Sequence, residues 1–93
     1  MADITGIRSN AQAQFNLANM LFQKKRYDDA LLHAQNAIAL NPGHQKSRQL
    51  AGSILFEQGK LNQAINLFDA VLTINPKSTA AHHYKGLIFL RQK

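Results

Sequence analysis

Side chains that could do chemistry are few in this sequence, and their spacing does not favour catalysis. His82 and His83 are adjacent, so on a helix they point about 100° apart and cannot chelate a metal as an i, i+4 pair does. Asp28 and Asp29 stand at the expected start of a helix, where they complement the helix dipole. The absence of cysteine excludes thiolate chemistry and cysteine-based metal sites. We therefore expect no enzyme, no catalytic residue, no metal site and no cofactor.

Charge is the second feature with chemical meaning. Eleven Lys and Arg residues against five Asp and Glu give a net charge of +6. Seven basic and two acidic residues lie in 45–93, a net of +5, against +1 for residues 1–44. This excess favours an anionic partner, a nucleic acid or simply a solvated surface. RNA-binding helical repeats read bases with pairs or triplets of side chains in each repeat, and no such repeated set occurs here. Nucleic-acid binding is therefore the least favoured function.

Length and hydropathy limit the class of protein. The chain has 93 residues, of which 45% are hydrophobic and 17% are charged, and this is not the composition of a disordered segment. No apolar run approaches the ~18–20 residues of a transmembrane helix. Residues 1–10 lack the basic and apolar regions of a signal peptide. We expect one small domain without a membrane span, located in the cytoplasm.

The elements that would position any binding residues follow from an internal repeat. Pro42 and Pro76, each preceded by Asn, lie 34 residues apart, and the same offset places Ala30 on Ala64. Apolar residues recur at i, i+3 and i+4 within each unit, whereas no segment alternates with a period of two. The small residues that share one phase of the repeat, and that we expect at helix crossings, are Ala18, Gly52 and Gly86.

Helix boundaries follow from the residues that stop and start helices. Pro42 and Pro76 each close a helix, because proline has no N–H to donate and restricts the residue before it. Gly59 makes the turn within the second unit. Ser78 and Thr79 can cap a fifth helix that runs to about residue 92. The pattern predicts an all-α fold of about five helices.

These features resemble the tetratricopeptide repeat (TPR) family, whose 34-residue helix–turn–helix units carry Gly, Ala and Pro markers. The resemblance covers residues 11–93 and implies a right-handed α-solenoid of antiparallel helix pairs. It divides the chain into an N-terminal leader (1–10), two repeats (11–44 and 45–78) and the first helix of a third repeat or a capping helix (79–93). The sequence departs from the family near the start of each first helix, where Trp is common and Gln14, Arg48 and His82 stand instead.

The resemblance implies that the first helices line a concave groove. Aromatic and amide side chains at the groove positions are typical of a site for an extended peptide or an amphipathic helix. We expect a protein–protein interaction module, an adaptor or assembly scaffold; burial of Phe22 and Phe56 between adjacent repeats is the alternative for those two rings. The expected groove residues are Gln12, Phe15, Asn16, Asn19, Phe22, Gln23, Lys46, Gln49, Leu50, Ser53, Phe56, Glu57, His83, Tyr84 and Leu87, with Ala80, Leu90 and Arg91 at further positions of the fifth helix.

One subclass of the family is tested residue by residue. Chaperone-binding members hold the carboxylate end of a peptide with a clamp of Lys, Asn, Asn, Lys and Arg. We do not expect capture of an acidic chaperone tail by that clamp, because only Asn19 has the required side chain. The five matching positions are Phe15, Asn19, Leu50, Ala80 and Tyr84.

The fifth helix supports an alternative function. It contains four consecutive apolar residues, and one helix cannot bury all of them against the preceding repeat. Self-association through this helix, giving a homo-oligomer, is therefore the second hypothesis. The residues expected to form that contact are Leu87, Ile88, Phe89 and Leu90.

Overall fold

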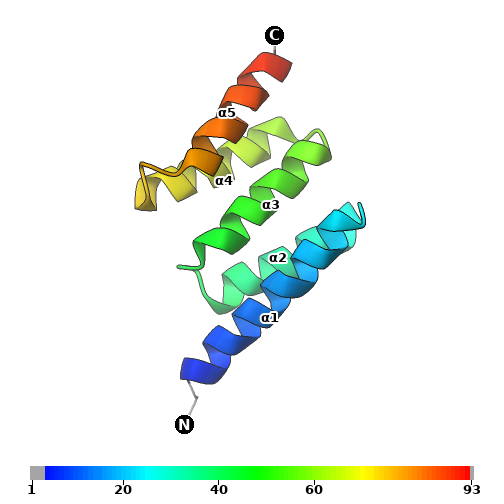
Figure 1. Cartoon of the computed structure of the whole chain (residues 1–93), viewed down its shortest axis with the longest axis vertical. Coiled ribbons are helices and arrows are strands. Elements are labelled where there is room, and N and C mark those ends of the chain that lie inside the picture. The colour runs from blue at the N-terminus through cyan, green and yellow to red at the C-terminus, as the bar shows by residue number, and fades with distance from the viewer. Residues whose placement is uncertain (1–3, 93) are drawn as a thin grey trace.

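The computed structural model describes the backbone of residues 4–92 and the side chains of residues 10–92. These residues form five helices and no strand, which confirms the all-α prediction. Successive helices are antiparallel and stack from the N-terminal to the C-terminal end of the molecule (Figure 1), which measures 51 × 29 × 17 Å. The helices are α1 (Ile4–Gln23), α2 (Tyr27–Leu40), α3 (Gln45–Glu57), α4 (Leu61–Ile74) and α5 (Thr79–Arg91).

The helix ends agree with the sequence in most places. Pro42 and Pro76 follow α2 and α4 directly, each after an Asn at the helix C-cap. Ser78 caps α5 by accepting a hydrogen bond from the backbone N–H of Ala81 at 3.3 Å. The start of α1 differs: it begins at Ile4, so most of the expected leader is helical. No proline occurs between that residue and the first repeat, so no residue there forces the helix to start later.

The five helices form two layers. We call α1, α3 and α5 the inner layer and α2 and α4 the outer layer (Figure 1). Within the inner layer α1 contacts α3 and α3 contacts α5, whereas no Cα of α2 lies within 8 Å of a Cα of α4. Because inner-layer helices are closer together than outer-layer ones, the stack curves towards the inner layer. The concave side expected from the sequence is therefore the side of α1, α3 and α5.

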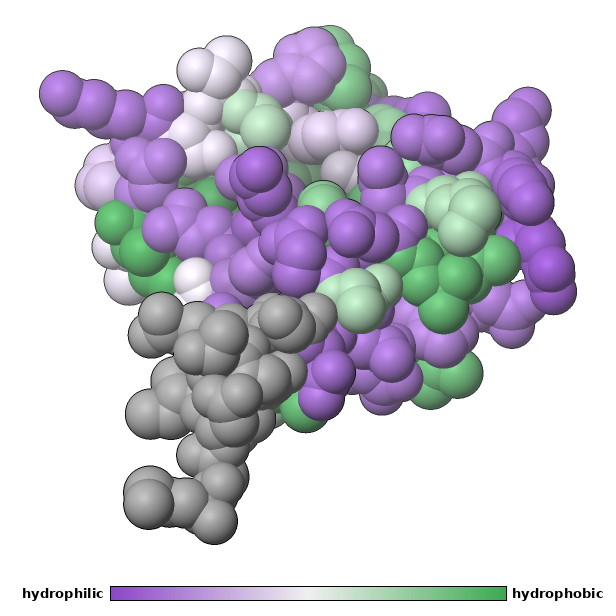
Figure 2. All heavy atoms as spheres, turned by 60° about the horizontal axis from the view of Figure 1, so that its bottom comes forward, coloured by the Kyte–Doolittle hydropathy of each residue, from purple (hydrophilic) through white to green (hydrophobic). Residues whose placement is uncertain are grey.

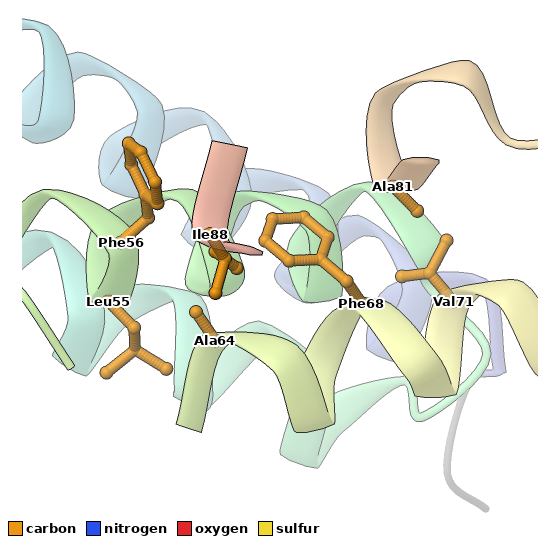
Figure 3. Packing of buried hydrophobic residues seen from close by; sticks show 7 residues of the cluster. All are labelled: Leu55, Phe56, Ala64, Phe68, Val71, Ala81 and Ile88. Carbon is orange, nitrogen blue, oxygen red and sulfur yellow. The ribbon is translucent and has the colours of Figure 1, made fainter. Parts of the chain in front are cut away.

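The core has two parts with different side chains. Around α1, α2 and α3 it consists largely of alanines, which let the helix axes approach closely, together with Leu50 and Ile54. The second part is centred on the ring of Phe68, which stacks on Tyr84 at 5.0 Å between ring centroids. Its buried side chains come from α3, α4 and α5 (Figure 3) and are Leu55, Phe56, Ala64, Phe68, Val71, Ala81 and Ile88.

The three small residues of one phase do not have the same surroundings. Ala18 is fully buried, as the sequence predicted. Gly52 lies under Phe68, where an added Cβ would be 2.7 Å from Cζ of the ring, so glycine is required for this close approach. Gly86 is exposed, and an added Cβ would meet nothing within 4 Å. The prediction that all three residues lie at helix crossings within this chain is therefore wrong for Gly86.

Polar side chains link neighbouring repeats at intervals of 34 residues. Arg48 Nε donates to the carbonyl oxygen of Pro42 at 3.0 Å, and His82 Nε2 donates to that of Pro76 at 2.8 Å. These are two of the positions where the sequence departs from the family pattern. Each of these side chains ties the start of an inner-layer helix to the end of the preceding outer-layer helix, so the departures make structural contacts.

The two turns within the helix pairs also match. Lys25 and Gly59 lie 34 residues apart and have positive φ angles of 63° and 79°. Glycine adopts this left-handed conformation without steric cost, so Gly59 makes the turn that the sequence predicted. At Lys25 the same conformation carries a Cβ and is strained.

Candidate functional site

The inner side of α1 carries most of the exposed groove residues. Asn16, Asn19 and Gln23 follow one another at helical spacing and are exposed or half-buried. Within the described residues, Asn19 and Gln23 make no side-chain hydrogen bond, whereas Asn16 Oδ1 accepts from Gln12 Nε2 at 2.9 Å. Gln49 of α3 is also half-buried and makes no side-chain hydrogen bond there. We call Asn16, Asn19, Gln23 and Gln49 the amide strip.

Half-buried aromatic rings lie beside the amide strip. Phe22 contacts Tyr27 with 5.8 Å between ring centroids, and Phe15 meets the imidazole of His44 edge-on at 5.4 Å. His44 is held in turn by Ser47 Oγ at 2.6 Å from Nδ1 and by Gln12 Oε1 at 3.1 Å from Nε2. The two phenylalanines are therefore fixed on one side by the fold and open to solvent on the other.

Helix α3 differs from the sequence expectation. Lys46 and Glu57 are exposed, but Leu50, Ser53 and Phe56 are buried and offer no open surface to a partner. The reason lies partly in α5, whose residues cover this part of α3. The Arg91 guanidinium lies 4.1 Å from the centroid of the Phe56 ring, and Tyr84 meets that ring edge-on at 5.6 Å. Burial between repeats, the alternative interpretation of the Phe56 ring, is therefore correct.

Helix α5 adds fewer exposed groove residues than expected. His83 is exposed, while Tyr84 and Leu87 are half-buried against the second part of the core. Among the residues expected to mediate self-association, Ile88 is fully buried and Leu87 is half-buried, so only Phe89 and Leu90 are open to solvent. The apolar run is therefore split between the core and the surface.

Basic side chains of the second half are engaged within the fold rather than gathered in one patch. Lys85 Nζ lies 2.6 Å from Asp69 Oδ1, Arg91 covers Phe56, and Arg48 bonds to a backbone carbonyl. Hydrophilic side chains cover most of the face shown in Figure 2, with apolar ones in separate patches. Within the described part of the chain, no group of three or more His, Asp or Glu residues could hold a metal, and no enclosed pocket is found. No described helix is long and apolar enough to span a membrane.

Comparison with known proteins agrees with this geometry. A family model described as tetratricopeptide repeat matches residues 21–88, more than half of the chain. This chain belongs to the tetratricopeptide repeat family. Domains of this family are generally non-catalytic modules for protein–protein interaction, and the chain is such a module by its family. No curated protein sequence matches the chain significantly.

A solved structure of a TPR domain is also similar. The second TPR domain of human RPAP3, determined by NMR in complex with the HSP70 peptide SGPTIEEVD, matches with a TM-score of 0.81 and 28% sequence identity. The match covers 85% of this chain and 66%, just under two thirds, of that chain. In our TPR chain, two positions of the chaperone-binding clamp are occupied by the buried Leu50 and by Tyr84, which stacks on Phe68.

Proposed function

We propose that this TPR chain binds a peptide or helix of a partner protein along its inner layer, as an adaptor or assembly scaffold. The observation that carries the proposal is the amide strip, which leaves donors and acceptors exposed on α1 and α3 without intramolecular partners at Asn19, Gln23 and Gln49. A carboxamide can donate to a carbonyl and accept from an N–H, so a row of them can pair with the backbone of an extended or helical segment.

The half-buried rings beside the strip complement these amides. Phe15 and Phe22 are held in position by His44 and Tyr27, so a partner side chain that packs on them loses little conformational freedom of the module. Each net hydrogen bond adds about 0.5–1.5 kcal/mol, which makes the apolar contacts the main source of affinity and the amides the source of register. The buried α3 residues form the rigid support behind this surface.

The similar RPAP3 domain supports a peptide as the class of ligand, since its structure holds a peptide from HSP70. The chemistry of the ligand differs in our proposal. Of the five clamp positions only Asn19 has a matching side chain, and none carries the Lys or Arg that neutralises a terminal carboxylate. We therefore propose an internal, backbone-paired segment as the ligand rather than a free acidic tail.

The experiment is affinity capture from the native cell followed by titration with the purified partner. Asn19→Ala combined with Gln23→Ala removes two exposed amides without touching the core, and we expect about a tenfold loss of affinity or more. Gln35→Ala combined with Asn66→Ala is the matched control, because these amides are exposed on the outer layer and make no side-chain hydrogen bond among the described residues. Equal affinities of the two double variants would contradict the proposal.

Adding Phe22→Ala to the inner-layer variant tests the apolar contribution. The half-buried ring also contacts Tyr27, so the thermal unfolding of this triple variant is measured alongside its binding. We expect capture of the partner to be lost while the helical circular dichroism of the folded chain is retained. Retained capture by a folded triple variant would contradict inner-layer binding.

Self-association through α5 remains the alternative, because Phe89 and Leu90 are exposed apolar side chains. It predicts a sedimentation coefficient that rises with protein concentration. A monomer at all concentrations would exclude this alternative and leave the inner-layer proposal untouched.

A further inference from the structure

Two residues of α5 occupy positions that an outer-layer helix covers elsewhere in the chain. Gly86 and Phe89 match Gly52 and Leu55 of α3 at the 34-residue offset. On α3 these positions meet α4: Gly52 lies directly under the Phe68 ring, and Leu55 belongs to the same core cluster as Ala64 and Phe68 (Figure 3).

The corresponding surface of α5 has no helix over it in the described chain. A Cβ at Gly86 would meet no atom within 4 Å, and Phe89 is an exposed apolar side chain, as is the neighbouring Leu90. We call Gly86, Phe89 and Leu90 the open face of α5. It combines a missing side chain, which permits close approach of a backbone, with two large apolar side chains that would gain from burial.

The two complete repeats show what shape fits such a face. The outer-layer helix presents buried residues at the spacing i, i+4, i+7 in both repeats. In α4 they are Ala64, Phe68 and Val71, and in α2 they are Ala30, Ala34 and Ala37. A helix with apolar residues at this spacing is therefore the shape that the open face matches.

Charge distinguishes between the proteins that could supply this helix. The sequence of α5 contains Lys85 and Arg91 but no Asp or Glu. Lys85 Nζ lies 6.0 Å from the centroid of the Phe89 ring, so positive charge borders the open face directly. Pairing α5 with α5 of a second copy would bring like charges together, which opposes association, whereas acidic residues on the docking helix would be attracted.

We propose that the open face of α5 docks an amphipathic helix of a partner protein, with apolar residues at i, i+4, i+7 and acidic residues beside them. This contact is independent of ligand binding along the inner layer. A chain of this kind would join two partner segments, one on the inner layer and one on α5.

The test uses a fluorescein-labelled synthetic helix and the full chain. The probe carries the α4 sequence, Leu61–Ile74, with Asn62→Glu, Gln63→Glu and Asn66→Glu, and with acetylated and amidated ends. The control peptide has Lys at the same three positions, so its apolar residues are unchanged and only its charge is reversed. Fluorescence anisotropy measures both affinities at low ionic strength, because exposed charges are screened by salt.

We expect the acidic peptide to bind at least about tenfold more tightly than the basic one. Gly86→Gln should weaken acidic-peptide binding by about tenfold or more, because a long side chain blocks the approach of the helix, while the melting temperature of the chain does not fall. Asn19→Ala combined with Gln23→Ala should leave this affinity unchanged, which separates the open face from the inner layer. In NMR titrations the amide signal of Gly86 should be among those that shift most.

Four results would overturn the proposal. These are no binding of the acidic peptide, equal binding of the two peptides, full binding by Gly86→Gln, and a concentration-dependent dimer that Gly86→Gln abolishes. The last result would assign the open face to a second copy of the chain. Failure of the inner-layer variants to affect partner capture would contradict only the proposed function, so the two outcomes are distinguishable.

Discussion

Helices α3 and α5 hold equivalent places in successive 34-residue units, yet solvent reaches them very differently. Leu55 and Phe56 of α3 are each 4% exposed, whereas the matching Phe89 and Leu90 of α5 are 54% and 65% exposed. All four are large apolar residues, so their chemical type does not account for the difference. Their neighbours account for it, because α3 has α4 and α5 beside it and α5 has no such helices in the described chain.

The other side of the same two helices shows no such difference. Ile54 and Ile88 are both fully buried, because this side meets the preceding repeat in each case. An inner-layer helix of this fold therefore has one side committed to the preceding repeat and another that needs a further helix. Stability in such arrays is close to a sum over neighbouring repeats, which makes matched substitutions in α3 and α5 a direct test.

The largest predicted difference is between Leu55→Ala and Phe89→Ala. Leu55→Ala removes a buried side chain and leaves a cavity, so we expect a loss of about 2–5 kcal/mol in the free energy of unfolding. Phe89→Ala removes a side chain that already contacts water, and we expect a loss of about 1 kcal/mol or less. Urea denaturation followed by circular dichroism measures both. Equal losses would show that the face around Phe89 is covered in solution.

A second pair of substitutions should differ in sign. Gly52→Ala places a methyl group against the Phe68 ring, which Tyr84 holds from another side, and this overpacking costs about 1–3 kcal/mol. Gly86→Ala enters open space within a helix and should stabilise the chain by about 0.5–1 kcal/mol. The melting temperatures of the two variants decide the matter. A rise for both would mean that the Phe68 ring moves aside without cost.

The turns within the repeats give the smallest predicted difference. Lys25→Gly relieves a left-handed conformation that carries a Cβ, and we expect a gain of about 1 kcal/mol. Gly59→Ala imposes that strain on the matching turn and should cost a similar amount. Thermal unfolding of the two single variants and of the double variant provides the check, and the double variant should be close to the wild type. A stabilising Gly59→Ala would contradict the matched geometry of the two turns.

Local signals in the sequence were sufficient for most of the fold. Pro42 and Pro76 end their helices because proline stops the hydrogen-bond ladder wherever it occurs, and Gly59 makes its turn because of its own backbone freedom. Ser78 caps α5 through its own hydroxyl. Each of these effects depends on a residue and its immediate neighbours in the chain, so the periodicity of one sequence is enough to predict it.

The candidate site was less predictable because its exposure depends on distant residues. Phe56 is buried by Arg91 and Tyr84, which lie about thirty residues further along the chain. A helical position alone cannot indicate that cover. The same limit applies to Gly86, whose phase matches Gly52 although no ring lies over it. The hydrogen bond from Arg48 to a proline carbonyl was also missed, and its recurrence at the 34-residue offset was the one signal that could have indicated it.

Chemical-shift mapping of a captured partner onto the backbone amides of this chain tests the central claim most directly. We predict that the largest shifts fall on the inner layer, in residues 16–23 of α1 and 46–49 of α3, and that α2 and α4 change little. A second set of shifts around Gly86 would indicate that the partner also occupies the open face of α5. Largest shifts on α2 and α4 would contradict binding along the inner layer.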